Sequence, residues 1–376
     1  MAGVIAMAAT AGAEAQWSVK NLDQGEGSRS QAYGIYGNTQ VGEIDIDSVG
    51  GHACMWSGTA QSLVDLHPGI FAQSSFALAT DGLTQVGYMT LASSVKNAVL
   101  WTGSAASYKN LNPAGATGSR AYGVDGNRQV GYVTFPNRQS GAVIWYGSAE
   151  SYKIITPESY QSASARSIFG DSIGGLGVIN GKDRALLWKD DGDVWFDLHP
   201  EGHSRDISAV YAVSATQQVG VTRFENQIRA ALWSGSAESW VELHPDGAAE
   251  SVALGGFGGY QVGFARFSDV PHAAIWHGSA ESWVDLNDFL PPEYIKSTAS
   301  GVWTDGHTLY VVGYASTAWM PEAFIWSMPI PAPGAAMPLA FAAMFGARRA
   351  RRHCAAVAGA MIADAPTLLS RGPTTG

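Results

Sequence analysis

The sequence contains one motif of the kind that carries a nucleophilic serine. Residues 170–174 read Gly-Asp-Ser-Ile-Gly and match the Gly-x-Ser-x-Gly elbow of hydrolases, with Ser172 at the centre. That elbow requires a strand, a sharp turn and a helix, with a histidine and an acid close by. Here the motif falls where other repeats carry an Asp-Gly turn, at Asp81, Asp125 and Asp305, and no helical pattern follows. We therefore interpret Ser172 as a turn residue and predict no catalytic residue.

Three histidines follow short strands that end in Asp-Leu or Glu-Leu, and together they could ligate a metal or face a ligand. They are His67, His199 and His244. The matching positions elsewhere hold Asp23, Asn112, Thr156 and Asn287. Residues in successive repeats are also too far apart to share a metal through bonds of about 2 Å. We favour polar turn residues over ligand contacts here, and we predict no metal site and no cofactor.

Phenylalanine and arginine recur together at the starts of three variable loops. The pairs are Phe135 with Arg138, Phe224 with Arg223, and Phe267 with Arg266. Aromatic and guanidinium groups on one rim could stack on a sugar or anchor a protein. Because Ile46 and Leu91 hold the matching positions in two other repeats, a buried loop base is the interpretation that we favour.

All these candidates belong to a unit that recurs along most of the chain. Each copy has a Val-Gly pair, an apolar run that ends in Trp, and a short strand of the type Val-Asp-Leu. The tryptophans are Trp56, Trp101, Trp145, Trp188, Trp233, Trp276 and Trp326, at spacings of 43 to 50 residues. A period of about 44 residues with four short strands is typical of β-propeller blades.

One copy of the unit is divided between the two ends of the array. Seven Trp strands are followed by only six Val-Asp-Leu strands, and the last unit has none. The missing copy precedes the first complete unit and contains Trp17, Val19 and Leu22; Leu22 lies 44 residues before Leu66. Pairing the two ends removes two exposed sheet edges. We therefore predict an all-β, seven-bladed propeller of four-stranded blades over residues 16–328, closed by an N-terminal strand that pairs with the last blade.

The first strand of five units carries Ser-x-Ala, as at Ser75 and Ala77. Because these innermost strands crowd around the axis of a propeller, we expect Ser, Ala, Gly and Tyr to line an axial channel. A propeller glycosidase needs two carboxylates about 5–10 Å apart, and no such pair interrupts the repeat. Any specific contact is expected in the loops that differ between units.

The repeat also resembles a known family. The core Gly-Val-x-Gly-x-x-Gln-Val-Gly at residues 123–131, the Ala-x-x-Trp strand and the Val-Asp-Leu strand are similar to those of extracellular HAF-type repeat proteins. The resemblance covers residues 16–328. It implies an exported repeat array and assigns no activity.

Both ends resemble targeting segments. Residues 1–15 are apolar, rich in Ala and end in Ala-Glu-Ala, as a signal peptide does, although the basic n-region is missing. Residues 329–352 hold a Pro motif, a short apolar stretch and an Arg cluster, an order similar to a PEP-CTERM sorting signal. Pro338 interrupts the apolar stretch, which is shorter than the ~20 residues needed to span a bilayer. We predict a disordered tail over residues 353–376.

Composition narrows the function further. A net charge of −10 with 14% charged residues argues against nucleic-acid binding. The two cysteines, Cys54 and Cys354, do not indicate a disulfide because one lies in the predicted tail. We expect an exported, monomeric, cell-surface or extracellular protein that binds polysaccharide or a surface protein or is structural, with transient membrane association through its C-terminal segment. The alternative is a secreted propeller enzyme that acts on polysaccharide.

Overall fold

The computed structural model describes residues 16–331, except 26–27, 46–49, 70, 137–138, 201, 203–206 and 319. The predicted signal peptide, Arg138, the tail and nearly all of the predicted sorting segment lie outside the described residues. Their roles therefore stay predictions. Residues 17–330 form one compact unit.

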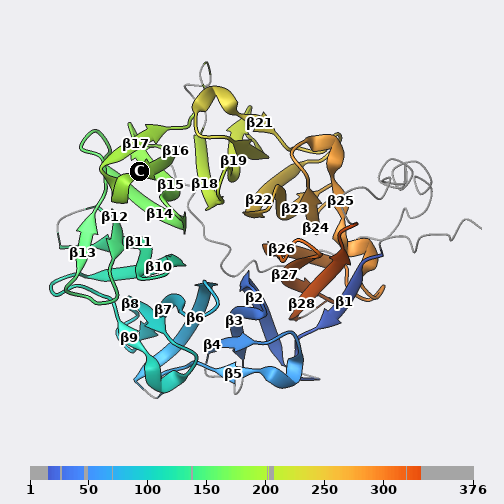
Figure 1. The fold of residues 1–376 in the computed structure, drawn as a ribbon, viewed down its shortest axis with the longest axis horizontal. Helices are drawn as coiled ribbons and strands as arrows, with labels where there is room; N and C mark the ends of the chain where they lie inside the picture. Colours follow the sequence, from blue (N-terminus) through green and yellow to red (C-terminus); the bar gives the residue numbers. More distant parts are fainter. Residues whose placement is uncertain are drawn as a thin grey trace, which may run out of the picture. The chain divides into compact units, whose positions relative to one another are not determined.

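Seven antiparallel sheets of four strands surround an axis, which confirms the predicted seven-bladed propeller (Figure 1). The innermost strands, in blades one to seven, are β2 (Arg29–Tyr36), β6 (Ala72–Thr80), β10 (Gly118–Asp125), β14 (Ser162–Phe169), β18 (Ile207–Val213), β22 (Glu250–Phe257) and β26 (Lys296–Thr304). The second strands are β3 (Thr39–Asp45), β7 (Gln85–Leu91), β11 (Arg128–Thr134), β15 (Ser172–Ile179), β19 (Gln218–Phe224), β23 (Tyr260–Arg266) and β27 (Thr308–Ser316).

The outer half of each blade carries the Trp strand and the short acidic strand. The third strands are β4 (Gly51–Trp56), β8 (Lys96–Trp101), β12 (Gly141–Trp145), β16 (Lys182–Lys189), β20 (Gln227–Trp233), β24 (Pro271–Trp276) and β28 (Pro321–Pro329). The outermost strands are β5 (Val64–Asp65), β9 (Lys109–Asn110), β13 (Tyr152–Ile154), β17 (Val194–Asp197), β21 (Val241–Glu242), β25 (Val284–Asp285) and, in blade seven, β1 (Ser18–Asn21).

The N-terminal strand closes the ring as the sequence predicts. Strand β1 pairs antiparallel with β28, with Val19 opposite Trp326. The amide of Leu22 donates to the carbonyl of Ala323 at 2.8 Å. Leu22 is fully buried and Trp17 is 9% exposed, so the strand contributes apolar contacts as well as hydrogen bonds.

The repeated tryptophans form the core between blades. All seven are at most 1% exposed, because the third strand of a blade is covered on both of its faces. The indole N–H of Trp188 donates to the carbonyl of Ile155 at 2.8 Å, and that of Trp326 donates to Leu286 at 3.1 Å. Both acceptors belong to the preceding blade, so each of these two rings joins two blades.

The Gly of the Val-Gly pair permits a close approach of the two inner strands. A Cβ placed on Gly131 would lie 1.8 Å from the carbonyl oxygen of Arg120, which excludes any larger residue. The register between the two strands then shifts by one residue between Ala121 and Gly123, as at a β-bulge. The same shift occurs in all seven blades.

Two further observations concern membrane-spanning helices and the cysteine of blade one. Within the part of the chain that the structure describes, no helix is long and apolar enough to cross a membrane. Cys54 is a free thiol, fully buried in β4, and burial raises its pKa well above the usual value.

Candidate functional site

The serine of each Ser-x-Ala motif holds the preceding blade. The hydroxyl of Ser75 accepts a hydrogen bond from the amide of Ala53 at 2.9 Å. That amide needs a partner because the outermost strand β5 ends beside it. The same bond recurs from Ala323 to Ser30, Ala98 to Ser119, Ala185 to Ser208, Ala230 to Ser251 and Ala273 to Ser297. Our expectation that these serines line the axis is therefore wrong, because they face the neighbouring blade.

The three predicted site histidines complete this junction. The Nδ1 atoms of His67, His199 and His244 lie 2.7–2.9 Å from the hydroxyls of Ser75, Ser208 and Ser251. Asp23, Asn112 and Asn287 accept from the corresponding serines. Blade four has Ala163 in place of the serine, and there Thr156 accepts directly from the amide of Ala142 at 2.9 Å.

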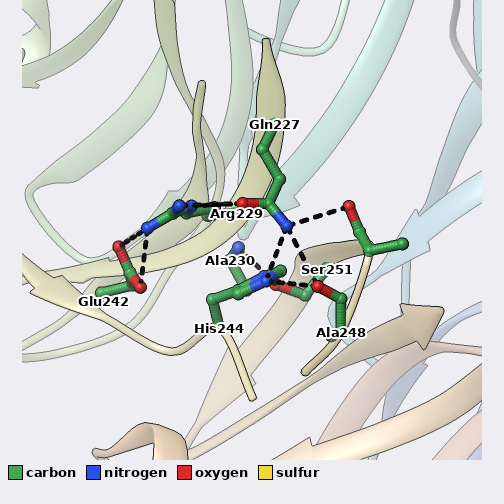
Figure 2. A network of polar contacts seen from close by, with 8 residues as sticks. Gln227, Arg229, Ala230, Glu242, His244, Ala248 and Ser251 are labelled. Atoms are coloured by element: carbon green, nitrogen blue, oxygen red, sulfur yellow. Dashed lines mark hydrogen bonds and ion pairs between the residues drawn. The ribbon is translucent and has the colours of Figure 1, made fainter. Parts of the chain in front are cut away.

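His244 illustrates the junction in detail (Figure 2). Its Nε2 lies 2.9 Å from the carbonyl oxygen of Ala248, which can only accept, so Nε2 carries the proton. Nδ1 then accepts from Ser251 at 2.7 Å, and Gln227 donates to the same carbonyl of Ala248 at 3.0 Å. Burial lowers the pKa of His244, which favours this neutral form. Both ring nitrogens are thus engaged within the blade junction, and no group of three potential metal ligands occurs among the described residues.

The three phenylalanines of the predicted Phe–Arg pairs each contact an aromatic side chain, and Arg138 lies outside the described residues. Each phenylalanine packs on the aromatic residue at the start of the outermost strand of its own blade. The ring centroids are 6.5 Å apart for Phe135 and Tyr152, 5.3 Å for Phe224 and Trp240, and 5.0 Å for Phe267 and Trp283. Arg266 forms an ion pair with Glu250 at 3.0 Å. Arg223 instead acts electrostatically on Asp183, near the axis.

Ser172 lies at the start of β15, directly after the turn from β14, and is 4% exposed. Its hydroxyl accepts a hydrogen bond from Nζ of Lys189 at 2.8 Å. A strand follows the turn where a nucleophile elbow has a helix; the turn itself is Gly170 and Asp171, and Ser172 begins the strand.

A different set of side chains gathers on the axial side of the blades. Five lie on the innermost strands, four lie on the second strands, and Asp183 lies on β16, the third strand of blade four. We call this set the axial cluster: Tyr33, Glu43, Tyr88, Arg120, Tyr122, Tyr132, Arg166, Asp183, Tyr211 and Tyr314. The predicted axial lining of Ser, Ala, Gly and Tyr included the tyrosines but not the arginines, Glu43 or Asp183.

The acidic end of the axial cluster lies in blade one. Glu43 is 6% exposed and accepts from Nε2 of Gln31 at 2.9 Å and from the hydroxyl of Tyr33 at 2.8 Å. Burial and then the charge of Glu43 raise the pKa of Tyr33 well above its usual value. The phenol therefore stays a proton donor to Glu43 across the physiological range.

The basic end is built from arginines stacked on tyrosines. The guanidinium carbon of Arg120 lies 4.5 Å from the ring centroid of Tyr88, and that of Arg166 lies 4.3 Å from the ring of Tyr122. Each arginine thus covers a tyrosine of the preceding blade. Such cation–π pairs stabilise a cation that has lost its water.

The remaining blades present apolar groups. Leu176, Ala209, Val221 and Val252 form one buried cluster, and Leu254 and Phe264 pack against it. Leu176 belongs to blade four and the others to blades five and six. The axial side of the ring is therefore aromatic and charged over blades one to four and mainly apolar over blades four to six.

No family model matches the sequence, and no curated protein matches it. Solved structures do match the fold. A puromycin hydrolase is 12% identical with a TM-score of 0.55, over 79% of this chain and 51% of that one. The β-propeller domain of the Trilobed protease from Pyrococcus furiosus is 10% identical with a TM-score of 0.54, over 79% of this chain and 93% of that one. An acylaminoacyl peptidase is 11% identical with a TM-score of 0.52, over 79% of this chain and 51% of that one.

These comparisons correct the expected function. The matched propellers are parts of peptidases, which contradicts our expectation of an exported binding or structural module and its alternative, a secreted enzyme acting on polysaccharide. This chain spans about half the length of the puromycin hydrolase and the acylaminoacyl peptidase. At these identities the likeness establishes the propeller fold, and no enzymatic activity of this chain is confirmed by it.

Proposed function

We propose that this chain is the β-propeller of a peptide-hydrolysing system, in which the axial cluster holds an extended peptide and a peptidase unit supplies the bond cleavage. The observation that carries the proposal is the composition of the axial side: stacked arginines and tyrosines face an apolar surface. The match to propellers of peptidases supports it.

An extended peptide is the ligand whose chemistry suits both halves. Its carbonyl and carboxylate oxygens accept hydrogen bonds. Among the described residues, the buried N–H donors at Nε of Arg120 and at Nε and Nη2 of Arg166 have no acceptor. Its apolar side chains would pack on the surface around Val221 and Val252. Glu43, which Arg29 approaches to 4.0 Å, is the acid at blade one that would attract a peptide amino group.

Binding of short fluorescein-labelled peptides to the full chain, followed by fluorescence anisotropy, tests the proposal. We expect Kd values below about 1 mM for unstructured peptides, and no binding when the same segment is held within a folded protein. Oligosaccharides of similar size are the comparison ligands. Binding of the oligosaccharides with no binding of any peptide would overturn the proposal.

A pair of variants locates the binding surface. Tyr88→Ala removes the ring beneath Arg120 and should weaken peptide binding roughly tenfold, because stacked aromatic contacts contribute on the order of 1 kcal/mol. Phe267→Ala is the matched control, since Phe267 is 45% exposed and packs on Trp283 of its own blade. If Phe267→Ala weakened binding and Tyr88→Ala did not, the peptide would not lie at the axis.

A further inference from the structure

Arg166 is a buried cation that forms no ion pair with the residues that the structure describes. It is 6% exposed, and its Nε and Nη2 atoms make no hydrogen bond with the described residues. Arg120 resembles it, because it also stacks on a tyrosine and has an unpartnered Nε, whereas several other arginines of the blades form ion pairs. Arg128 pairs with Asp125 and Asp191, Arg184 with Asp197, Arg229 with Glu242 and Arg266 with Glu250.

The nearest acid does not neutralise Arg166. Asp183 acts on it only at a distance, because no ion pair joins the two within 4.0 Å. Burial raises the pKa of Asp183, and the opposing charges of Arg166 and Arg223 do not cancel that shift. A buried guanidinium that is not paired carries a large desolvation cost, so a site of this kind is completed by an external anion.

The two free donors define the geometry of that anion. Nε and Nη2 lie on one edge of the guanidinium plane, and their N–H bonds are parallel. This edge matches the two oxygens of a carboxylate, which it binds through two hydrogen bonds. The ring of Tyr122 stacks on one face of the guanidinium group of Arg166, with its centroid 4.3 Å from the guanidinium carbon.

A third donor lies beside them. Ser164 is 7% exposed, and its hydroxyl has no partner among the described residues. Ser164 lies two residues before Arg166 on β14, and the register shift of that strand falls between Ala165 and Ser167. The matching side chains of blade three, Arg120 and Tyr122, interact with each other across the same shift, so we infer that Ser164 and Arg166 share a face. In blade three the position of Ser164 is taken by Arg120, and in blade seven it is taken by Thr298.

We propose that Arg166, Ser164 and Tyr122 form a carboxylate site, which holds the C-terminal carboxylate of the bound peptide. This inference rests on the proposed function and specifies its substrate as peptides with a free C-terminus. Such a peptide would bind with its C-terminus toward blade four. Glu43, from blade one, would then face the other end of the peptide.

The test compares pairs of peptides that differ only in their C-terminus, acid or amide, by titration calorimetry with the full chain. We expect the amide to bind roughly tenfold to a hundredfold more weakly, the effect of losing charge-assisted hydrogen bonds. Equal affinity for acid and amide would overturn the carboxylate site while leaving the proposed function intact. Absence of binding by both peptides would overturn the two together.

Variants separate recognition from a structural role. Arg166→Met should abolish the preference for the acid, and Ser164→Ala should reduce it. Arg184→Met, which removes an arginine already paired with Asp197, should leave the preference unchanged. Because Arg166→Met also removes an unpaired buried charge, its Tm should equal or exceed that of the parent. A preserved preference in Arg166→Met, or a lowered Tm with the preference intact, would assign Arg166 to the scaffold alone.

Discussion

The hydroxyl of Ser30 accepts a hydrogen bond from the amide of Ala323 at 3.0 Å, across a sequence separation of 293 residues. This bond joins the innermost strand of blade one to the third strand of blade seven. The same contact joins Ser75 of blade two to Ala53 of blade one. The ring is therefore closed twice, by this junction and by the pairing of β1 with β28.

Deleting residues 17–23 should destabilise the ring, whereas deleting residues 332–376 should not. The first deletion exposes the edge of β28 and removes the buried side chain of Leu22. Lost burial of Leu22 and Trp17 alone amounts to about 3 kcal/mol or more, which corresponds to a fall in Tm of roughly 5 °C or more. Thermal unfolding followed by circular dichroism measures both truncations. Equal Tm values would contradict the closure.

Ser75→Ala should lower the free energy of unfolding by about 1–3 kcal/mol, because it leaves the buried amide of Ala53 without a partner. Ser74→Ala is the matched control, since Ser74 is the adjacent residue and lies on the opposite side of the strand. Its effect should stay within about 0.5 kcal/mol. Urea denaturation measures the free energy of unfolding of both variants. Equal losses for Ser75→Ala and Ser74→Ala would show that the hydrogen bond to Ala53 contributes nothing to stability.

The histidines at the junctions should make the protein sensitive to acid. Burial lowers the pKa of both His67 and His244, with the charge of His52 adding to the effect at His67. A depressed histidine pKa gives stability that is present above the unfolded value of about 6.5 and is lost as the pH falls through the folded value. His67→Asn with His244→Asn copies Asn112 and Asn287. The double variant should therefore lose less stability than the parent between neutral pH and pH about 5, as measured by urea denaturation.

His272 should behave in the opposite way. Its hydrogen bond to Asp285, at 2.8 Å, raises its pKa against the effect of burial. A raised histidine pKa gives stability that is fully present below about 6.5 and is lost as the pH rises through the folded value. His272→Asn should thus cost stability at acidic pH and little at pH about 8. A loss of equal size at both values would show that the protonated form is not the one stabilised.

Gly131→Ala should prevent normal packing of blade three. The new Cβ would lie 1.8 Å from the carbonyl oxygen of Arg120, so the two inner strands would have to separate. We expect a loss of more than about 3 kcal/mol, the range of strain and overpacking in a core. Gly118→Ala in the same blade is the control, because its Cβ would meet only the carbonyl oxygen of Lys96 at 3.4 Å. Similar losses for both would contradict the close approach of the strands.

The ring was predictable because the repeat itself specifies backbone pairing. The Trp strands gave the blade count, and the displaced copy at Trp17 gave the closure. We favoured the interpretation that the phenylalanines are buried at the bases of the variable loops. Phe224 is 8% exposed, whereas Phe267 is 45% exposed.

The axial cluster was not predictable in the same way. Alternation places Ser119 and Arg120 on opposite faces of one strand, but it does not say which face meets the neighbouring blade. The deciding fact is the amide of Ala98, which donates to the hydroxyl of Ser119 in the next blade at 3.0 Å. The amide has no partner in its own blade because the outermost strand β9 is only two residues long and ends before it. The ends of strands are the least predictable part of a sequence-based assignment.

The division of blade seven between β1 and β28 also has a consequence for synthesis of the chain. Because β1 is made first and its partner is made about 300 residues later, a ribosome at about 5–20 residues per second separates them by tens of seconds. During that time β1 has no partner strand, and the growing row of blades has open edges at both ends. Closure is a contact of very long sequence separation, which makes it the slow step in folding. The ring therefore reaches its full stability only after the last blade has been translated.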